Sequence, residues 1–121
     1  MKKILIAEDS PAMRSLMIST IEALEGFDIV EAANGFEALR LLPREKVDLV
    51  ITDINMPDIN GLELIRYIRN NANYLTIPLF IISTESSEKD LAKGLALGAN
   101  EYLIKPFDPQ QLQNLIIKYL A

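Results

Sequence analysis

The sequence predicts an α/β fold, in which a parallel sheet carries helices on both of its faces. Short apolar runs alternate with segments whose apolar residues recur at helical spacing, and five of each follow one another along the 121 residues. Strict alternation of this kind is typical of strands joined by crossover helices. The length suits one domain, expected over residues 1–121, with no repeat or linker.

In the first half of the chain, apolar runs predict strands at residues 3–7, 27–31 and 47–52. The helix after the first strand begins at Ser10 and Pro11, an N-cap followed by proline at the first helical position. It runs to about residue 24, and Gly26 ends it. The second helix covers residues 36–42 and ends at Pro43.

The second half predicts strands at residues 79–82 and 102–104 and three further helices. These helices begin near Asn60, at a capping-box spacing from Ser87 to Asp90, and at Pro109. Gly98 closes the middle one. Their apolar faces carry, in order, Leu64, Ile65, Ile68 and Ala72; Leu91 and Leu95; and Leu112, Leu115, Ile116 and Tyr119.

The composition excludes several classes of function. The chain has no cysteine and no histidine, which excludes a disulfide framework, thiol catalysis, a Ser-His triad, a phosphohistidine carrier and a histidine-based metal site. Its formal net charge of −5 disfavours direct binding of DNA or RNA. No run is long and apolar enough for a membrane span or a secretory signal, so a cytoplasmic domain is expected.

Polar residues follow four of the five predicted strands. Because the carboxyl ends of parallel strands meet at one edge of a sheet, these side chains are expected to form one cluster. Its members are Glu8 and Asp9, Asp53, Ser83 or Thr84, and Lys105. Three carboxylates without histidine or cysteine suit a hard cation such as Mg²⁺, and Mn²⁺ is a second choice. With a lysine and a hydroxyl, the set matches the needs of phosphoryl transfer onto a carboxylate.

These motifs, in this order, resemble the signature of response regulator receiver domains. They are the acidic pair Glu8-Asp9, the segment DINMPDING at 53–61, the pair Ser83-Thr84 and the segment KPF at 105–107. The resemblance covers the whole chain and is similar in pattern to the single-domain chemotaxis regulators. It implies a doubly wound, flavodoxin-like sheet with strand order 2-1-3-4-5.

The resemblance also implies a role for each motif residue. Asp53 accepts a phosphoryl group from a sensor histidine kinase. Asp9, Asp53 and the backbone carbonyl of Asn55 bind Mg²⁺, and Glu8 assists through water. Ser83 is the switch hydroxyl and Lys105 pairs with phosphoryl oxygens.

Further implications concern the output. Tyr102 is the aromatic whose rotamer follows the switch, although core packing is an equal alternative for it. The fourth helix, fifth strand and fifth helix form the face that binds an output protein or a downstream domain. The Lys105-Pro106 bond is expected to be cis. Asn55 and Glu85 occupy positions that tune dephosphorylation in the family.

One departure leaves the switch hydroxyl open. The residue after it is usually small in the family, and here it is Thr84, so Thr84 rivals Ser83. Three other functions fit the sequence less well. An aspartyl-phosphate phosphatase needs a second acid where Asn55 stands. A flavodoxin-like cofactor binder needs a phosphate loop where Glu8 and Asp9 would repel phosphate, and a receiver that is never phosphorylated would not need the full acid set. The expectation is therefore a signalling domain with only self-directed phosphoryl chemistry, rather than an enzyme.

Overall fold

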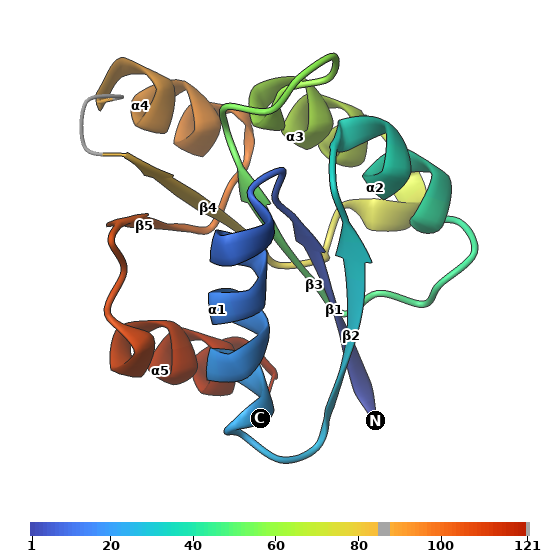
Figure 1. Ribbon diagram of the computed structural model, residues 1–121. Coiled ribbons are helices and arrows are strands. Elements are labelled where there is room, and N and C mark those ends of the chain that lie inside the picture. The colour runs from blue at the N-terminus through green and yellow to red at the C-terminus, as the bar shows by residue number, and fades with distance from the viewer. Residues whose placement is uncertain (85–87, 121) are drawn as a thin grey trace.

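The structure, a computed structural model, describes residues 1–84 and 88–120. Within them a five-stranded parallel sheet has the order β2-β1-β3-β4-β5, which confirms the expected doubly wound topology (Figure 1). The strands are β1 (Lys2–Ala7), β2 (Phe27–Ala32), β3 (Leu49–Asp53), β4 (Leu79–Thr84) and β5 (Glu101–Lys105).

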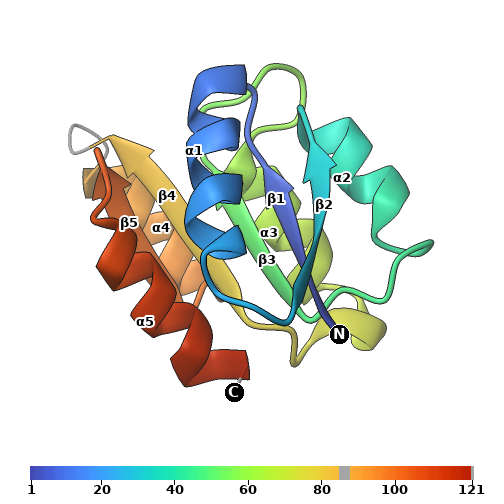
Figure 2. The same ribbon diagram turned by 60° about the horizontal axis from the view of Figure 1, so that its bottom comes forward.

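Helices cover both faces of this sheet. They are α1 (Pro11–Glu22), α2 (Gly35–Leu41), α3 (Gly61–Arg69), α4 (Glu88–Leu97) and α5 (Pro109–Leu120), with a short 3-10 turn η1 (Ala72–Tyr74). Helices α1 and α5 lie on one face, and α2, α3 and α4 lie on the other (Figure 2). None of the described helices is long and apolar enough to cross a bilayer.

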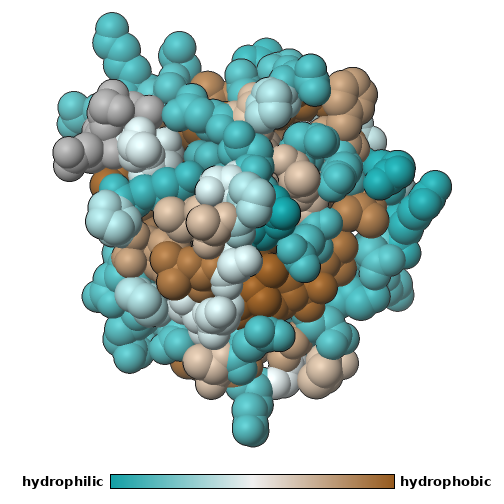
Figure 3. Space-filling view, in the orientation of Figure 1, coloured by the Kyte–Doolittle hydropathy of each residue, from teal (hydrophilic) through white to brown (hydrophobic). Residues whose placement is uncertain are grey.

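The core has two layers because side chains alternate across each strand. On β3, Leu49 and Ile51 pack with Met17 of α1 and Ile116 of α5. Val50 points to the opposite face, where the layer is built from α2, α3 and α4. Apolar side chains also gather on the surface beside α1 (Figure 3). Strand β3 is buried along its whole length, so its last residue is held by packing on both faces.

The helix starts follow the sequence signals. Ser10 caps α1 by accepting a hydrogen bond from the Met13 amide, with Pro11 at the first position. Asn60 forms a reciprocal capping box with Glu63 at the start of α3. The predicted capping box of α4 includes Ser87, which lies outside the described residues.

Several boundaries differ from the prediction. Strand β3 begins at Leu49 instead of residue 47, and β4 and β5 continue to Thr84 and Lys105. Helix α3 ends at Arg69, so Ala72 lies in η1 and is no part of its apolar face. Leu95 was predicted on the buried face of α4, but its side chain is 39% exposed. Four residues advance a helix by about 400°, so Leu95 lies about 40° around the axis from the buried Leu91, at the edge of the packed face.

Candidate functional site

Three carboxylates meet at the carboxyl edge of the sheet, as predicted. Glu8 and Asp9 directly follow β1, and Asp53 is the last residue of β3. One oxygen of each lies within 4.8 Å of the others. Glu8 is fully buried and Asp53 is 4% exposed, whereas Asp9 is exposed. The cluster therefore has two sheltered acids and one that faces solvent.

Lys105, the last residue of β5, brings a cation into this cluster. Its Nζ donates to Asp53 Oδ2 at 3.0 Å and lies 2.8 Å from Glu8 Oε1. Burial acts to lower the pKa of Lys105, but the two carboxylates outweigh it and leave the pKa above its ordinary 10.5. The ammonium is thus charged at neutral pH and offsets one of the three negative charges. The expected cis bond joins Lys105 to Pro106.

Backbone and side-chain contacts fix Glu8 in its buried place. The Ser10 amide donates to Glu8 Oε2 at 3.1 Å, and the Glu8 amide donates to the Ala32 carbonyl at 3.0 Å. Arg14 donates to the Glu8 carbonyl at 2.7 Å while pairing with Glu31 at 3.1 Å. Burial raises the pKa of the Glu8 carboxyl above its ordinary value of 4.5, against the contact with Lys105 and the amide of Ser10.

The two hydroxyl candidates at the end of β4 have different surroundings. Ser83 is fully buried, and its Oγ has no hydrogen-bond partner among the described residues. Thr84 is exposed. A buried hydroxyl without a partner costs free energy, so a ligand oxygen at this place would satisfy it. Glu8 Oε1 differs from this hydroxyl, because it is an acceptor that already has the ion-pair contact with Lys105, although it has no hydrogen bond among the described residues.

The segment after Asp53 folds tightly under the site. The Asn55 amide donates to Asp53 Oδ1 at 3.4 Å, and the Gly61 amide donates to the Ile54 carbonyl at 2.8 Å. A Cβ at Gly61 would collide with the Asp53 carbonyl, and Asp58 turns the chain with a φ of 66°. The Asn-Gly pair signalled a turn, but the sequence carried no sign that Gly61 lies against the backbone of Asp53.

Two further candidates lie away from the acids. Tyr102 is 46% exposed on β5, so the alternative that it packs in the core is wrong. Glu85, predicted to tune dephosphorylation, lies outside the described residues.

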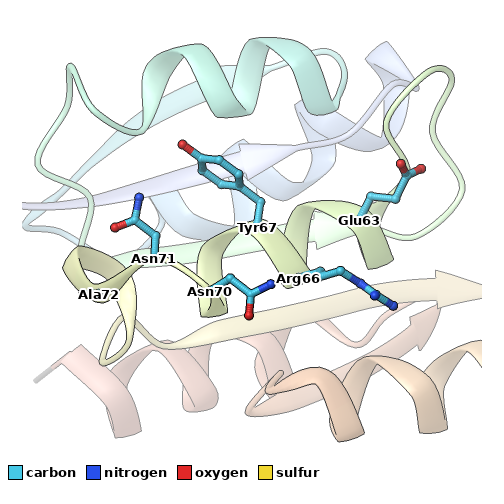
Figure 4. Close-up of a pocket in the computed structure, with 6 residues that line it drawn as sticks. All are labelled: Glu63, Arg66, Tyr67, Asn70, Asn71 and Ala72. Carbon is cyan, nitrogen blue, oxygen red and sulfur yellow. The ribbon is translucent and has the colours of Figure 1, made fainter.

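The donor set fits a hard divalent cation. Glu8, Asp9 and Asp53 offer three carboxylate oxygens against the single ammonium of Lys105, so the cluster keeps an excess of negative charge. Oxygen donors with such an excess are what Mg²⁺ prefers in proteins. A groove of about 600 Å³ lies elsewhere, on the outer side of α3 and η1, and none of the three acids lines it (Figure 4).

Comparison with known proteins agrees with this geometry. Residues 4–117 match the response regulator receiver domain. The chain is 39% identical over 112 residues to a chemotaxis protein CheY homolog of Campylobacter jejuni, covering 92% of this chain and 86% of that protein.

Solved structures agree as well. CheY4 of Vibrio cholerae superimposes with a TM-score of 0.89 at 32% identity, with 99% of both chains covered. The receiver domain of the sensor histidine kinase PA1611 of Pseudomonas aeruginosa gives a TM-score of 0.88 at 27% identity, covering 98% of this chain and 96% of that one. That structure has a magnesium ion coordinated in its active site cleft. The chain belongs to the response regulator receiver domains of two-component systems, and within them it is CheY-like.

Proposed function

We propose that this receiver domain accepts a phosphoryl group on Asp53 from a sensor histidine kinase and thereby changes its affinity for an output partner. The observation that carries the proposal is the position of Lys105, whose Nζ contacts both Asp53 and Glu8 beside three clustered carboxylates. This arrangement supplies the three groups that phosphoryl transfer needs. Asp53 is the carboxylate that reacts, Lys105 is the cation that contacts phosphoryl oxygens, and the remaining carboxylates can bind a metal ion.

In the proposed transfer, a carboxylate oxygen of Asp53 attacks the phosphorus of the donor phosphohistidine. A new P–O bond forms as the P–N bond breaks, and the imidazole leaves with the electron pair. Lys105 exchanges part of its contact with Asp53 for a phosphoryl oxygen, which limits the build-up of negative charge. Asp53 is 4% exposed, and this burial limits the directions from which a donor can approach its carboxylate.

Mg²⁺ would supply charge neutralisation of the transferring phosphoryl oxygens, with Mn²⁺ as a substitute. Asp9, Asp53 and the backbone carbonyl of Asn55 would hold it, and Glu8 would act through water. The exposed Asp9 gives the ion access from solvent, while the buried Glu8 keeps the inner side of the site negative.

The proposed switch begins at Ser83. A phosphoryl group adds close to two negative charges and new acceptor oxygens beside a buried hydroxyl that has no partner among the described residues. Ser83 is favoured over Thr84 because its burial gives the greater gain from a new hydrogen bond. Tyr102, half exposed on β5, would follow the movement of the β4 end and alter the α4-β5-α5 face.

This face is the proposed contact for an output protein or a downstream domain, without direct binding of nucleic acid or insertion into a membrane. The proposed unit is one receiver domain over residues 1–121, acting in the cytoplasm. Its only chemistry would be its own phosphorylation and dephosphorylation.

The test is incubation with Mg²⁺ and a small-molecule phosphodonor, followed by intact-mass measurement. A gain of one phosphoryl group is expected in the wild type and in Asp58→Asn, which removes an exposed acid from the same loop. The gain should be absent from Asp53→Asn. A gain that survives Asp53→Asn, or no gain in the wild type, would contradict the proposal.

A further inference from the structure

A groove between α3 and α4 combines an apolar floor with two cations. It is lined by Leu62, Arg66, Lys93, Ala96 and Leu97 and has a volume of about 460 Å³. Arg66 comes from α3 and Lys93 from α4, so the two cations stand on different walls. Leu62 and Leu97 are half-buried and give the floor its apolar character. We call it the α3–α4 groove.

The two cations of this groove have no carboxylate contact within the part of the chain that the structure describes. Lys3, Arg14, Lys105 and Lys118 each contact a carboxylate. Neither Arg66 nor Lys93 does so with any described residue, although the chain has a net charge of −5. Arg66 and Tyr67 leave α3 in different directions, and Tyr67 points toward α2 (Figure 4). The groove therefore presents positive charge on a chain that is negative as a whole.

Contacts within the free protein fix the two helices that form the walls of the groove. Helix α4 approaches the sheet at Gly94, where a Cβ would collide with Ile81. At the end of α3, Arg69 donates to the carbonyls of Gly98 and Tyr74, both at 2.9 Å, and to Asn100 Oδ1 at 3.0 Å. These bonds tie α3 to the end of α4. A preformed groove loses little conformational entropy on binding.

We propose that the α3–α4 groove docks an acidic amphipathic helix of a partner protein. The leucines of the floor would take the apolar side of such a helix, and Arg66 and Lys93 would take the carboxylates on its flanks. Nucleic acid fits less well because the chain lacks a basic excess. An anionic membrane fits less well because recognition of lipid headgroups uses clusters of about four to eight basic residues.

This surface is distinct from the α4-β5-α5 face of the proposed switch. Lys93 and Leu95 are two residues apart on α4 and so project to nearly opposite sides of the helix. Leu95 is 39% exposed, as expected for a residue on the outer side. Docking in the groove consequently does not require phosphorylation of Asp53.

The probe for the test is a synthetic amphipathic helix with leucines on one side and glutamates flanking them. Its control peptide carries glutamine for every glutamate. Titration into ¹⁵N-labelled protein should shift the amide signals of Leu62, Lys93 and Leu97, and the glutamine peptide should bind more weakly. The Asp53→Asn variant should bind the probe as the wild type does. The groove proposal would therefore still hold if the phosphorylation of Asp53 were disproved.

The double variant Arg66→Gln/Lys93→Gln should weaken binding by about tenfold. The matched control is Arg40→Gln/Lys46→Gln, which removes two exposed charges elsewhere and should leave affinity unchanged. The proposal would be overturned if both double variants weakened binding equally or if both peptides bound equally. It would also be overturned if the probe did not bind, or if the shifts were confined to Leu95 and Tyr102. Tighter binding to single-stranded DNA or to anionic vesicles, lost in the first double variant, would overturn it in favour of that occupant.

Discussion

Glu8 is the residue whose ionisation opposes folding. Burial raises its pKa above 4.5, so between 4.5 and the raised value the folded state keeps a proton that the unfolded state has released. The folded state binds more protons in that window, and the free energy of unfolding must fall as pH rises through it. We expect Glu8→Gln, which does not titrate, to gain stability relative to the wild type as pH rises above 4.5.

The measurement is chemical denaturation at a series of pH values in a metal chelator. Glu25→Gln is the control, because it removes a carboxyl from an exposed side chain and should parallel the wild type. A constant difference between Glu8→Gln and the wild type across the range would contradict the burial of a strained carboxyl.

The clustering of the acidic residues with Lys105 was predictable because each of these residues ends or follows a predicted strand. The proximity of Asp53 and Lys105 could be predicted from the sequence, since parallel topology brings the carboxyl ends of strands together. The burial or exposure of the neighbouring candidate residues could not be predicted from the sequence. The full burial of Ser83 beside an exposed Thr84, and the exposure of Tyr102, depend on the twist and packing of β4 and β5 and leave no mark on neighbouring residue types.

At the scale of elements, the clamp made by Arg69 shows what sequence patterns do not reveal. Its bonds go mostly to backbone carbonyls, which every residue type has, and its partners at Gly98 and Asn100 lie 29 and 31 residues away. Asn100 Oδ1 also accepts from the Leu79 amide at 2.8 Å, so the clamp reaches the start of β4. Periodicity predicted the existence of α3 and α4, although it misplaced Ala72 and Leu95, and it gave no information on how the ends of the two helices are joined.

Replacing Arg69 by lysine should therefore loosen the end of α4. A lysine has one compact donor group and cannot reproduce the planar fork that reaches three separate acceptors. We expect Arg69→Lys to lower the free energy of unfolding by about 1–3 kcal/mol and to speed hydrogen exchange in α4. Arg66→Lys on the same helix is the matched control and should change stability by less than about 0.5 kcal/mol. Equal stability of the two variants would show that the clamp contributes nothing.

At the scale of the whole molecule, the packing of the fold holds together a cluster of like charges whose mutual repulsion destabilises the folded state. The hydrophobic layers on both faces of the sheet force Glu8 and Asp53 together with Asp9, although like charges repel. Lys105 offsets one negative charge and leaves an excess of two, from three carboxylates and one ammonium. The repulsion within this excess destabilises the folded state and is outweighed by the packing of the entire domain. A bound cation would reduce the repulsion.

Addition of Mg²⁺ should consequently reverse the order of stability of the wild type and the Asp9→Asn variant. Without metal, Asp9→Asn should be more stable than the wild type because it removes one of three clustered charges. With Mg²⁺ at ten times its dissociation constant, the wild type should gain about 1.4 kcal/mol by linkage, while Asp9→Asn gains little. Thermal unfolding with and without Mg²⁺ measures both differences, and Asp58→Asn, an exposed acid beyond the cluster, should gain as the wild type does. If Asp9→Asn and the wild type gained equally from Mg²⁺, Asp9 would be no ligand, and the proposed metal site would have to be abandoned.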